Sequence, residues 1–168
     1  RVVGRDGSIV GEFATERRVV LRYDEIPPVM RQAVLSAEDS GFFEHFGFSI
    51  TGLVRAVVTN VIEMRKAGGA STLTQQLARK LSHTDKKTWE RKVKELLLSV
   101  QIEKRYTKEE IFTLYCNQMY FGHGAYGVEA ASQLYFGKPV KDVTVDEAAL
   151  IAGILLGARN FFDPTMGA

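Results

Sequence analysis

The sequence of 168 residues has few features that could cross-link a fold or span a membrane. Its single cysteine, Cys116, excludes a disulfide framework and a thiolate zinc cluster. The longest apolar run, Ala148 to Ala158, has eleven residues, whereas a spanning helix needs about 18 or more. No internal repeat or low-complexity tract divides the chain, so we expect one globular domain over residues 1–168. Because the chain begins at Arg1 without a methionine, we expect it to be a fragment of a longer protein.

The charge of the chain is nearly balanced, and a net +2 does not indicate a partner. The cations are nevertheless concentrated: residues 79–94 carry seven Lys and Arg against two acids, a local charge of +5. Such a stretch is typical of a phosphate, anionic-lipid or nucleic-acid contact, and equally of a solvated helix face. The charge pattern alone leaves these alternatives open.

The apolar periodicity predicts a mainly α domain with a short β entry. Residues 1–23 have an extended pattern, with Asp6-Gly7 as a hairpin turn. Helical spacing follows over residues 30–39, 50–62, 71–81, where Ser71 is the expected cap, and 88–104, with Trp89, Val93, Leu96, Leu97 and Val100 on one face. Two capping boxes, Thr107-x-x-Glu110 and Thr144-x-x-Glu147, each open another apolar periodic segment.

Two familiar motif classes are excluded by their context. Gly122-x-Gly124-x-x-Gly127 has the letters of a dinucleotide fingerprint, but it follows a capped helix instead of a strand. We therefore expect a tight helix connection that needs positive φ angles. The three histidines, His45, His83 and His123, are too far apart for a zinc-binding pair. A hard cation at Asp39 or Glu95 stays open.

Acids stand in apolar surroundings at two places in the chain. Glu38 and Asp39 precede a segment that holds four phenylalanines and a histidine, and acids that end a helix oppose its dipole. This placement favours a functional role over exposed surface acids. On the predicted helix 88–104, Glu95 shares one face with Arg91, Leu98 and Ile102. Because the opposite face is also apolar, we expect Glu95 to be buried with Arg91 as its partner, in either a functional or a purely structural ion pair.

Five ordered motifs together resemble the glycosyltransferase family 51 domain. This domain is the peptidoglycan polymerase module of class A penicillin-binding proteins and of monofunctional transglycosylases. The resemblance covers about Asp6 to Pro164. The motifs are Glu38-Asp39-x-x-Phe42-x-x-His45-x-Gly47, the segment Gly69 to Leu77, Arg91-Lys92-x-x-Glu95, Glu110-Ile111-x-x-Leu114-Tyr115-x-Asn117 and Gly124-Ala125-Tyr126-Gly127-Val128.

The resemblance implies a lysozyme-like, two-lobed helical fold that polymerises lipid II into β-1,4 glycan with inversion, releasing undecaprenyl diphosphate. Glu38 would be the general base. Glu95 would be the second acid of the site, placing the diphosphate or an ion bound to it. No cofactor is obligatory, although Mg²⁺ or Mn²⁺ near Glu95 stays open. The implied substrate- or diphosphate-binding residues are Asp39, Phe42, His45, Ser71, Thr72, Gln75, Gln76, Arg79, Arg91, Lys92 and Asn117.

The resemblance also implies a location and partners. It places the chain at the extracytoplasmic (periplasmic) face of the bacterial cytoplasmic membrane, with the stripe from Ile50 to Ile62 next to the bilayer and no nucleic-acid partner. A membrane anchor before this fragment and a covalently attached transpeptidase domain after it are expected, and no Ser-x-x-Lys occurs within it. Arg79, where Lys is more common in the family, keeps the charge but changes its geometry.

Two rival functions remain for this sequence. A lysozyme-like hydrolase would also use paired carboxylates, but it does not need a basic, diphosphate-ready helix. A non-catalytic module for anionic lipid or nucleic acid would use the basic segment, but it gives Glu38 and Glu95 no reason to lie in apolar surroundings.

Overall fold

The structure is a computed structural model that describes residues 2–3, 9–11, 17–47, 71–82 and 89–161. The described part is mainly helical, as the periodicity predicts. Its helices are the 3-10 helix η1 (Tyr23–Glu25), α1 (Pro28–Glu38), α3 (Leu73–Ser82), α4 (Trp89–Arg105), α5 (Lys108–Gln118), α6 (Val128–Phe136), the 3-10 helix η2 (Val140–Asp142) and α7 (Val145–Phe161). The helix predicted over residues 50–62 lies outside the described residues. None of the described helices combines the length and apolarity that crossing a bilayer requires.

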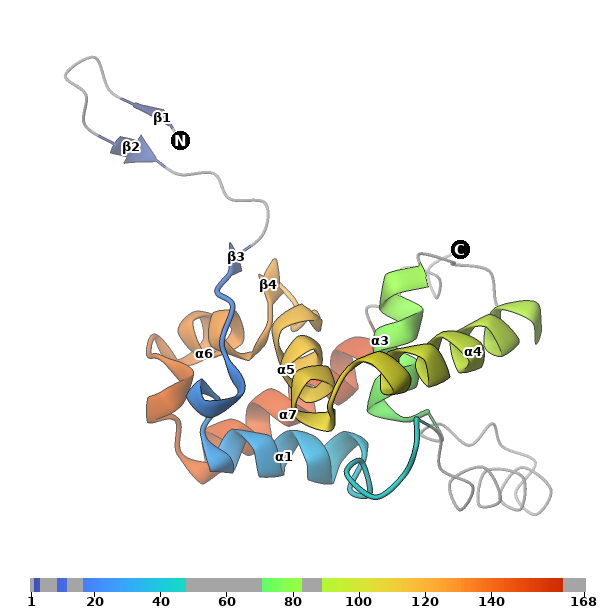
Figure 1. The fold of residues 1–168 in the computed structure, drawn as a ribbon. Helices are drawn as coiled ribbons and strands as arrows, with labels where there is room; N and C mark the ends of the chain where they lie inside the picture. Colours follow the sequence, from blue (N-terminus) through green and yellow to red (C-terminus); the bar gives the residue numbers. More distant parts are fainter. Residues whose placement is uncertain (1, 4–8, 12–16, 48–70, 83–88, 162–168) are drawn as a thin grey trace.

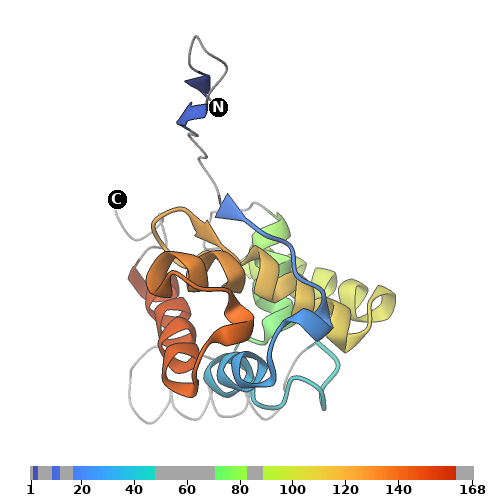
Figure 2. The same ribbon diagram turned by 90° about the vertical axis from the view of Figure 1, so that its left-hand side faces the viewer.

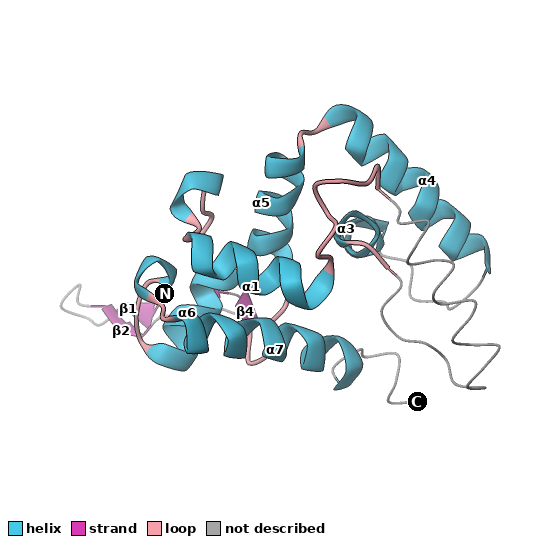
Figure 3. Cartoon of the chain, turned by 90° about the horizontal axis from the view of Figure 1, so that it is seen from below, coloured by secondary structure: helices cyan, strands magenta, loops and turns pink. Residues whose placement is uncertain are grey.

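The helices pack in two pairs around α5. Helix α1 lies beside α7, and α3 packs on α4 (Figures 1 and 3). Helix α5 contacts α3, α4 and α6, and α6 contacts α7, so α5 and α6 together connect the two pairs. The core is filled by fully buried side chains from several helices, among them Met30, Leu77, Phe112 and Ile151. The lysozyme-like division into two lobes stays a prediction.

The β-structure consists of short paired segments. Strands β1 (Val2–Val3) and β2 (Ile9–Gly11) pair antiparallel, but the turn predicted at Asp6-Gly7 lies outside the described residues, so the hairpin stays a prediction. Strand β3 (Arg17–Arg18) pairs in parallel with β4 (Ala125–Tyr126), which brings the N-terminal segment onto the helices (Figure 2).

A side-chain amide holds the chain just after β3. Asn117 of α5 accepts a hydrogen bond from the Leu21 amide at 2.9 Å and donates one to the Leu21 carbonyl at 2.8 Å. The amide thus pairs with both backbone groups of one residue, as a neighbouring strand would. Because Asn117 is itself buried, this contact fixes where the extended segment joins the helical body.

The helix starts follow the predicted capping chemistry, with one correction. The reciprocal hydrogen bonds of Thr107 with Glu110 and of Thr144 with Glu147 are both present. At the start of α3, however, the side-chain acceptor is Thr72, whose hydroxyl lies 3.3 Å from the Gln75 amide. The cap predicted at Ser71 is therefore wrong by one residue. The Ser71 hydroxyl faces Lys92 instead.

The glycine-rich connection between α5 and α6 has the expected positive φ angles. Gly122, Gly124 and Gly127 all lie in that region, and so does His123 at 50°. At Gly127 the requirement is also steric, because a Cβ atom would lie 2.9 Å from the Asn117 carbonyl oxygen. The glycines follow helix α5 and not a strand, which confirms the predicted context of the motif.

We expect Asn117→Ala to destabilise the domain by about 1–3 kcal/mol, because Leu21 loses both side-chain partners while its backbone stays partly buried. Urea denaturation followed by circular dichroism measures this loss. Gln32→Ala removes an exposed amide from α1 and serves as the control. Equal stability of the two variants would contradict the role assigned to Asn117.

Candidate active site

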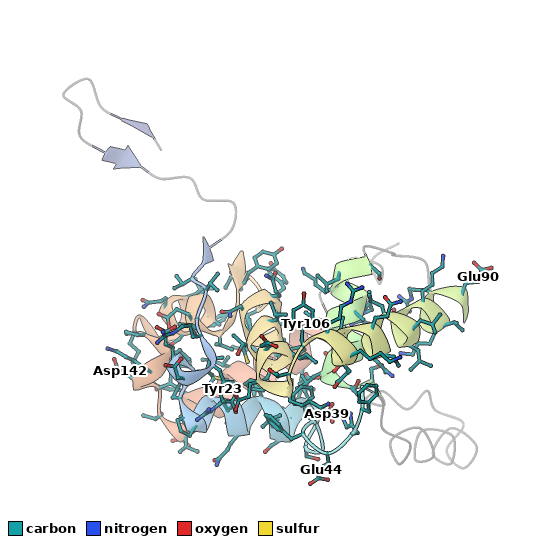
Figure 4. All side chains as sticks on the ribbon, viewed as in Figure 1. Tyr23, Asp39, Glu44, Glu90, Tyr106 and Asp142 are labelled. Carbon is teal, nitrogen blue, oxygen red and sulfur yellow. The ribbon has the colours of Figure 1, made fainter. Side chains whose placement is uncertain are left out.

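Glu38 is the last residue of α1, and its neighbour Asp39 ties that helix end to the start of α3. Asp39 accepts a hydrogen bond from the Leu73 amide at 3.1 Å, and His45 Nε2 lies 2.9 Å from both Asp39 carboxylate oxygens. The dipole of α1 disfavours a negative charge at its C-terminal end. Asp39, however, also lies at the N-terminus of α3, where the helix dipole stabilises an anion. Figure 4 shows Asp39 at this junction, with Glu44 on the outer side of the turn.

A continuous chain of polar contacts connects Glu38 with Glu95. Gln76 Nε2 donates to Glu38 Oε2 at 2.7 Å and lies 3.4 Å from the Ser71 carbonyl. The Ser71 hydroxyl accepts from Lys92 Nζ at 3.0 Å, and the same ammonium lies 3.4 Å from Glu95 Oε2. Ser71, just before α3, and Gln76 in its first turn therefore lie between the two acids, which come from α1 and α4.

Glu95 is buried beside two cations. Its side chain is 3% exposed, Arg91 Nε lies 3.2 Å from Oε1, and Lys92 approaches the other oxygen. The ion pair expected from the helical spacing of Arg91 and Glu95 is confirmed. An arrangement of two cations around one buried acid holds the cations in fixed places, which is what recognition of a phosphate group requires.

The other apolar face of α4 is not buried, which corrects the prediction for that helix. Val93 is 55% exposed and Leu97 is 60% exposed, with Leu96 also exposed. Of the described elements, α3 covers the Glu95 side of α4, so only that side needs to be apolar for packing. Lys94 of the same helix is also exposed, whereas the ammonium of Lys92 is directed toward Ser71 and Glu95.

A family model described as Transglycosylase matches residues 6–166. The chain belongs to the transglycosylase family. Among curated relatives it is 44% identical to penicillin-binding protein 1A of Vibrio cholerae over 92% of the chain. It is 46% identical to penicillin-binding protein 4 of Bacillus subtilis over 89% of the chain, and 42% identical to penicillin-binding protein 1A of Escherichia coli over 98%. The chain spans only 19%, 24% and 19% of these relatives, respectively.

Several predicted site residues of this transglycosylase have buried, supporting positions. Phe42 is fully buried against Phe112, so contact with a substrate would require its ring to leave the core. Thr72 donates to the Gly47 carbonyl at 2.8 Å, which holds the end of the 39–47 turn against α3. Gln75 is also buried in the first turn of α3.

Two other predicted residues lie apart from the chain of contacts around Glu38. Arg79 is exposed near the C-terminal end of α3. Asn117 is engaged by Leu21, as described above. Substrate binding by Arg79 or Asn117 stays a prediction, and the geometry gives Asn117 a structural role.

The described side chains that contact the Glu95 carboxylate are two cations. Among the residues that the structure describes, no three His, Cys, Asp or Glu side chains converge on one point. Glu95 already faces two cations, and a cation next to it would be repelled by both. The site suits a bound anion better, and Mg²⁺ or Mn²⁺ near Glu95 stays a prediction.

A second ion pair, which the sequence patterns do not reveal, packs against α3 and Phe42 and so helps to hold the candidate site in place. Lys108 Nζ lies 2.9 Å from Glu103 Oε1 and 4.4 Å from the centre of the Phe42 ring. Glu103, 3% exposed, also accepts a hydrogen bond from Thr74 of α3. The two charged residues belong to different helices, so helical spacing could not predict their contact.

We expect Lys108→Met to destabilise the transglycosylase domain by about 2–4 kcal/mol, because it leaves the Glu103 carboxylate buried without its counter-charge. The double variant with Glu103→Gln and Lys108→Met should recover most of the loss, since no buried charge remains. Thermal and urea unfolding compare the single and double variants. A single variant as stable as wild type would contradict a stabilising ion pair.

Proposed function

We propose that this chain is a peptidoglycan glycosyltransferase domain that polymerises lipid II into β-1,4-linked glycan with inversion. The observation that carries the proposal is the polar chain from Glu38 through Gln76, Ser71 and Lys92 to Glu95. It connects an acid suited to proton transfer with cations suited to a diphosphate, in a chain of the transglycosylase family.

In this proposal Glu38 acts as the general base. Its carboxylate takes the proton from the 4-hydroxyl of the acceptor sugar, and the oxygen attacks the anomeric carbon of the donor. The bond from that carbon to the diphosphate oxygen breaks, and both bonding electrons leave with the undecaprenyl diphosphate. One displacement on an α-linked donor gives a β-linked product, so no covalent enzyme intermediate is required.

The cations of α4 would stabilise the leaving diphosphate. Negative charge grows on its oxygens as the bond breaks, and fixed positive groups are most effective where that charge develops. Arg91 and Lys92 are both held by the buried Glu95 carboxylate, which orients them and limits their mutual repulsion. Glu95 is in this view a supporting acid of the site, and Arg79 adds a cation at the other end of α3.

The exposed apolar side of α4 supports action at a membrane surface. Val93, Leu96 and Leu97 are exposed on a helix that also carries the exposed Lys94, a combination suited to an anionic bilayer. We therefore place the domain at the extracytoplasmic face of the bacterial cytoplasmic membrane, with lipid II and the growing glycan as its partners and no nucleic acid. The much longer penicillin-binding relatives support a covalently attached transpeptidase domain in the whole protein.

We expect Glu38→Gln to abolish formation of glycan polymer from lipid II in detergent, because an amide cannot accept the acceptor proton. Gel separation of the products, with and without added Mg²⁺ or Mn²⁺ and with a chelator, measures polymer and ion dependence together. Glu44→Gln, an exposed acid of the same turn, is the matched control and should retain activity. Polymer from Glu38→Gln would contradict its role as base. If wild type shortened preformed strands and made none, the domain would be a hydrolase.

We expect Arg91→Ala to weaken binding of a lipid II donor by about 10-fold and to lower the unfolding free energy by about 3 kcal/mol. Both effects follow from removing one of the two described cations beside the buried Glu95. Binding to detergent-solubilised lipid II and chemical denaturation measure them separately. Lys94→Ala, which removes an exposed cation of the same helix, should change neither by a comparable amount. Unchanged donor affinity in Arg91→Ala would remove Arg91 from the diphosphate site.

A further inference from the structure

The side-chain amide of Gln76 has only acceptors on one side. Its Nε2 lies 2.7 Å from the Glu38 carboxylate and 3.4 Å from the Ser71 carbonyl oxygen. Neither an ionised carboxylate nor a carbonyl can donate a hydrogen bond. If the amide rotated by half a turn, its own oxygen would face these two oxygens. The favourable orientation is therefore the one with the NH₂ group toward Glu38.

The opposite side of the same amide meets a tyrosine. Gln76 Oε1 lies 3.1 Å from the hydroxyl of Tyr115, a residue of α5 that is 1% exposed. Since the amide oxygen can only accept, the tyrosine hydroxyl must donate. The tyrosine hydroxyl thus stabilises the same amide orientation in which the NH₂ group donates to Glu38. Gln76 is itself buried, so bulk water does not compete strongly for either side of the amide.

We propose that Tyr115 is a positioning residue for the glycosyl transfer. Its hydroxyl fixes the Gln76 amide, and the amide holds the Glu38 carboxylate where it receives the proton of the acceptor sugar. This inference rests on the proposed function, with Glu38 as base. It gives Gln76 the role of positioning Glu38, in addition to the substrate contact that the resemblance implies for it. The contacts join α1, α3 and α5, so the position of the base depends on the packing of three helices.

The expected effect falls on turnover and not on substrate binding. Without the tyrosine hydroxyl the Gln76 amide oxygen loses its hydrogen bond. The amide is then held from one side only, and Glu38 is held less firmly in place. A base that is misplaced by a fraction of an ångström to 1 Å slows proton transfer. Arg91 and Lys92, which the proposed function assigns to the diphosphate, are held by their own contacts to Glu95.

The experiment compares Tyr115→Phe with wild type in steady-state polymerisation of lipid II. We expect kcat to fall by about 10-fold or more while KM for lipid II changes by less than about 2-fold. Tyr135→Phe is the matched control, because it removes a tyrosine hydroxyl that donates to the Phe121 carbonyl at 2.6 Å outside the site. Its kcat should stay at the wild-type value. Unchanged kcat in Tyr115→Phe would overturn the proposal.

A double variant tests whether Tyr115 acts through Gln76. In a Gln76→Ala background the amide is gone, so Tyr115→Phe should cause little further loss of kcat. If the tyrosine were merely structural, Tyr115→Phe would lower kcat by the same factor in the wild-type and Gln76→Ala backgrounds, and would lower the melting temperature equally in both. That additive result would overturn the positioning role.

A measurement independent of activity separates this inference from the proposed function. In ¹⁵N–¹H spectra, with the Gln76 side-chain NH₂ assigned by its loss in Gln76→Ala, we expect Tyr115→Phe to shift and broaden that signal, whereas Tyr135→Phe leaves it unchanged. An unaltered signal in Tyr115→Phe would overturn the contact even if the enzyme polymerises lipid II. A shifted signal in a domain that makes no polymer would retain the contact and reject the proposed reaction.

Discussion

An acid at the C-terminal end of a helix needs donors from another part of the chain, and the site of this transglycosylase domain is built around that requirement. Glu38 ends α1, where the helix dipole opposes a negative charge. The Gln76 amide of α3 supplies a donor, and the neighbouring Asp39 takes the backbone amide at the start of the same helix. Two adjacent carboxylates at one helix end thus each accept a hydrogen bond from the first turn of α3.

This arrangement makes the position of the candidate base depend on helix packing. Two threonine hydroxyls hold α3 against its neighbours. Thr72 donates a hydrogen bond to the 39–47 turn, and Thr74 donates one to Glu103 of α4. Lys108 of α5 neutralises that acid and covers the Phe42 ring. Buried polar groups of this kind are costly when they lack partners, so they specify one relative placement of the helices. Packing and site geometry are therefore stabilised by the same contacts.

The charge distribution follows the same division between the two sides of α4. On the side covered by α3, Glu95 is buried and holds Arg91 and Lys92 in place. On the opposite side, Val93, Leu96 and Leu97 are exposed. One helix can therefore present fixed cations toward the candidate site and apolar side chains outward. A domain that transfers a sugar from a lipid-linked diphosphate at a bilayer surface, as proposed, would need both.

The sequence by itself determined the features that depend on neighbours along one helix. The approximate spans of α1, α3 and α4, the two capping boxes, the positive φ angles near Gly127 and the Arg91–Glu95 pair follow from spacings of a few residues, whereas α6 is not among the predicted helices. It could not determine that the Val93 side of α4 is exposed, because an apolar stripe does not say which element covers it. The contacts of Gln76 with Glu38 and Tyr115 span 38 and 39 residues, and that of Asp39 with Leu73 spans 34. Only the tertiary structure decided these contacts, because helical periodicity orients side chains within an element, whereas the packing of separate helices sets which of them meet.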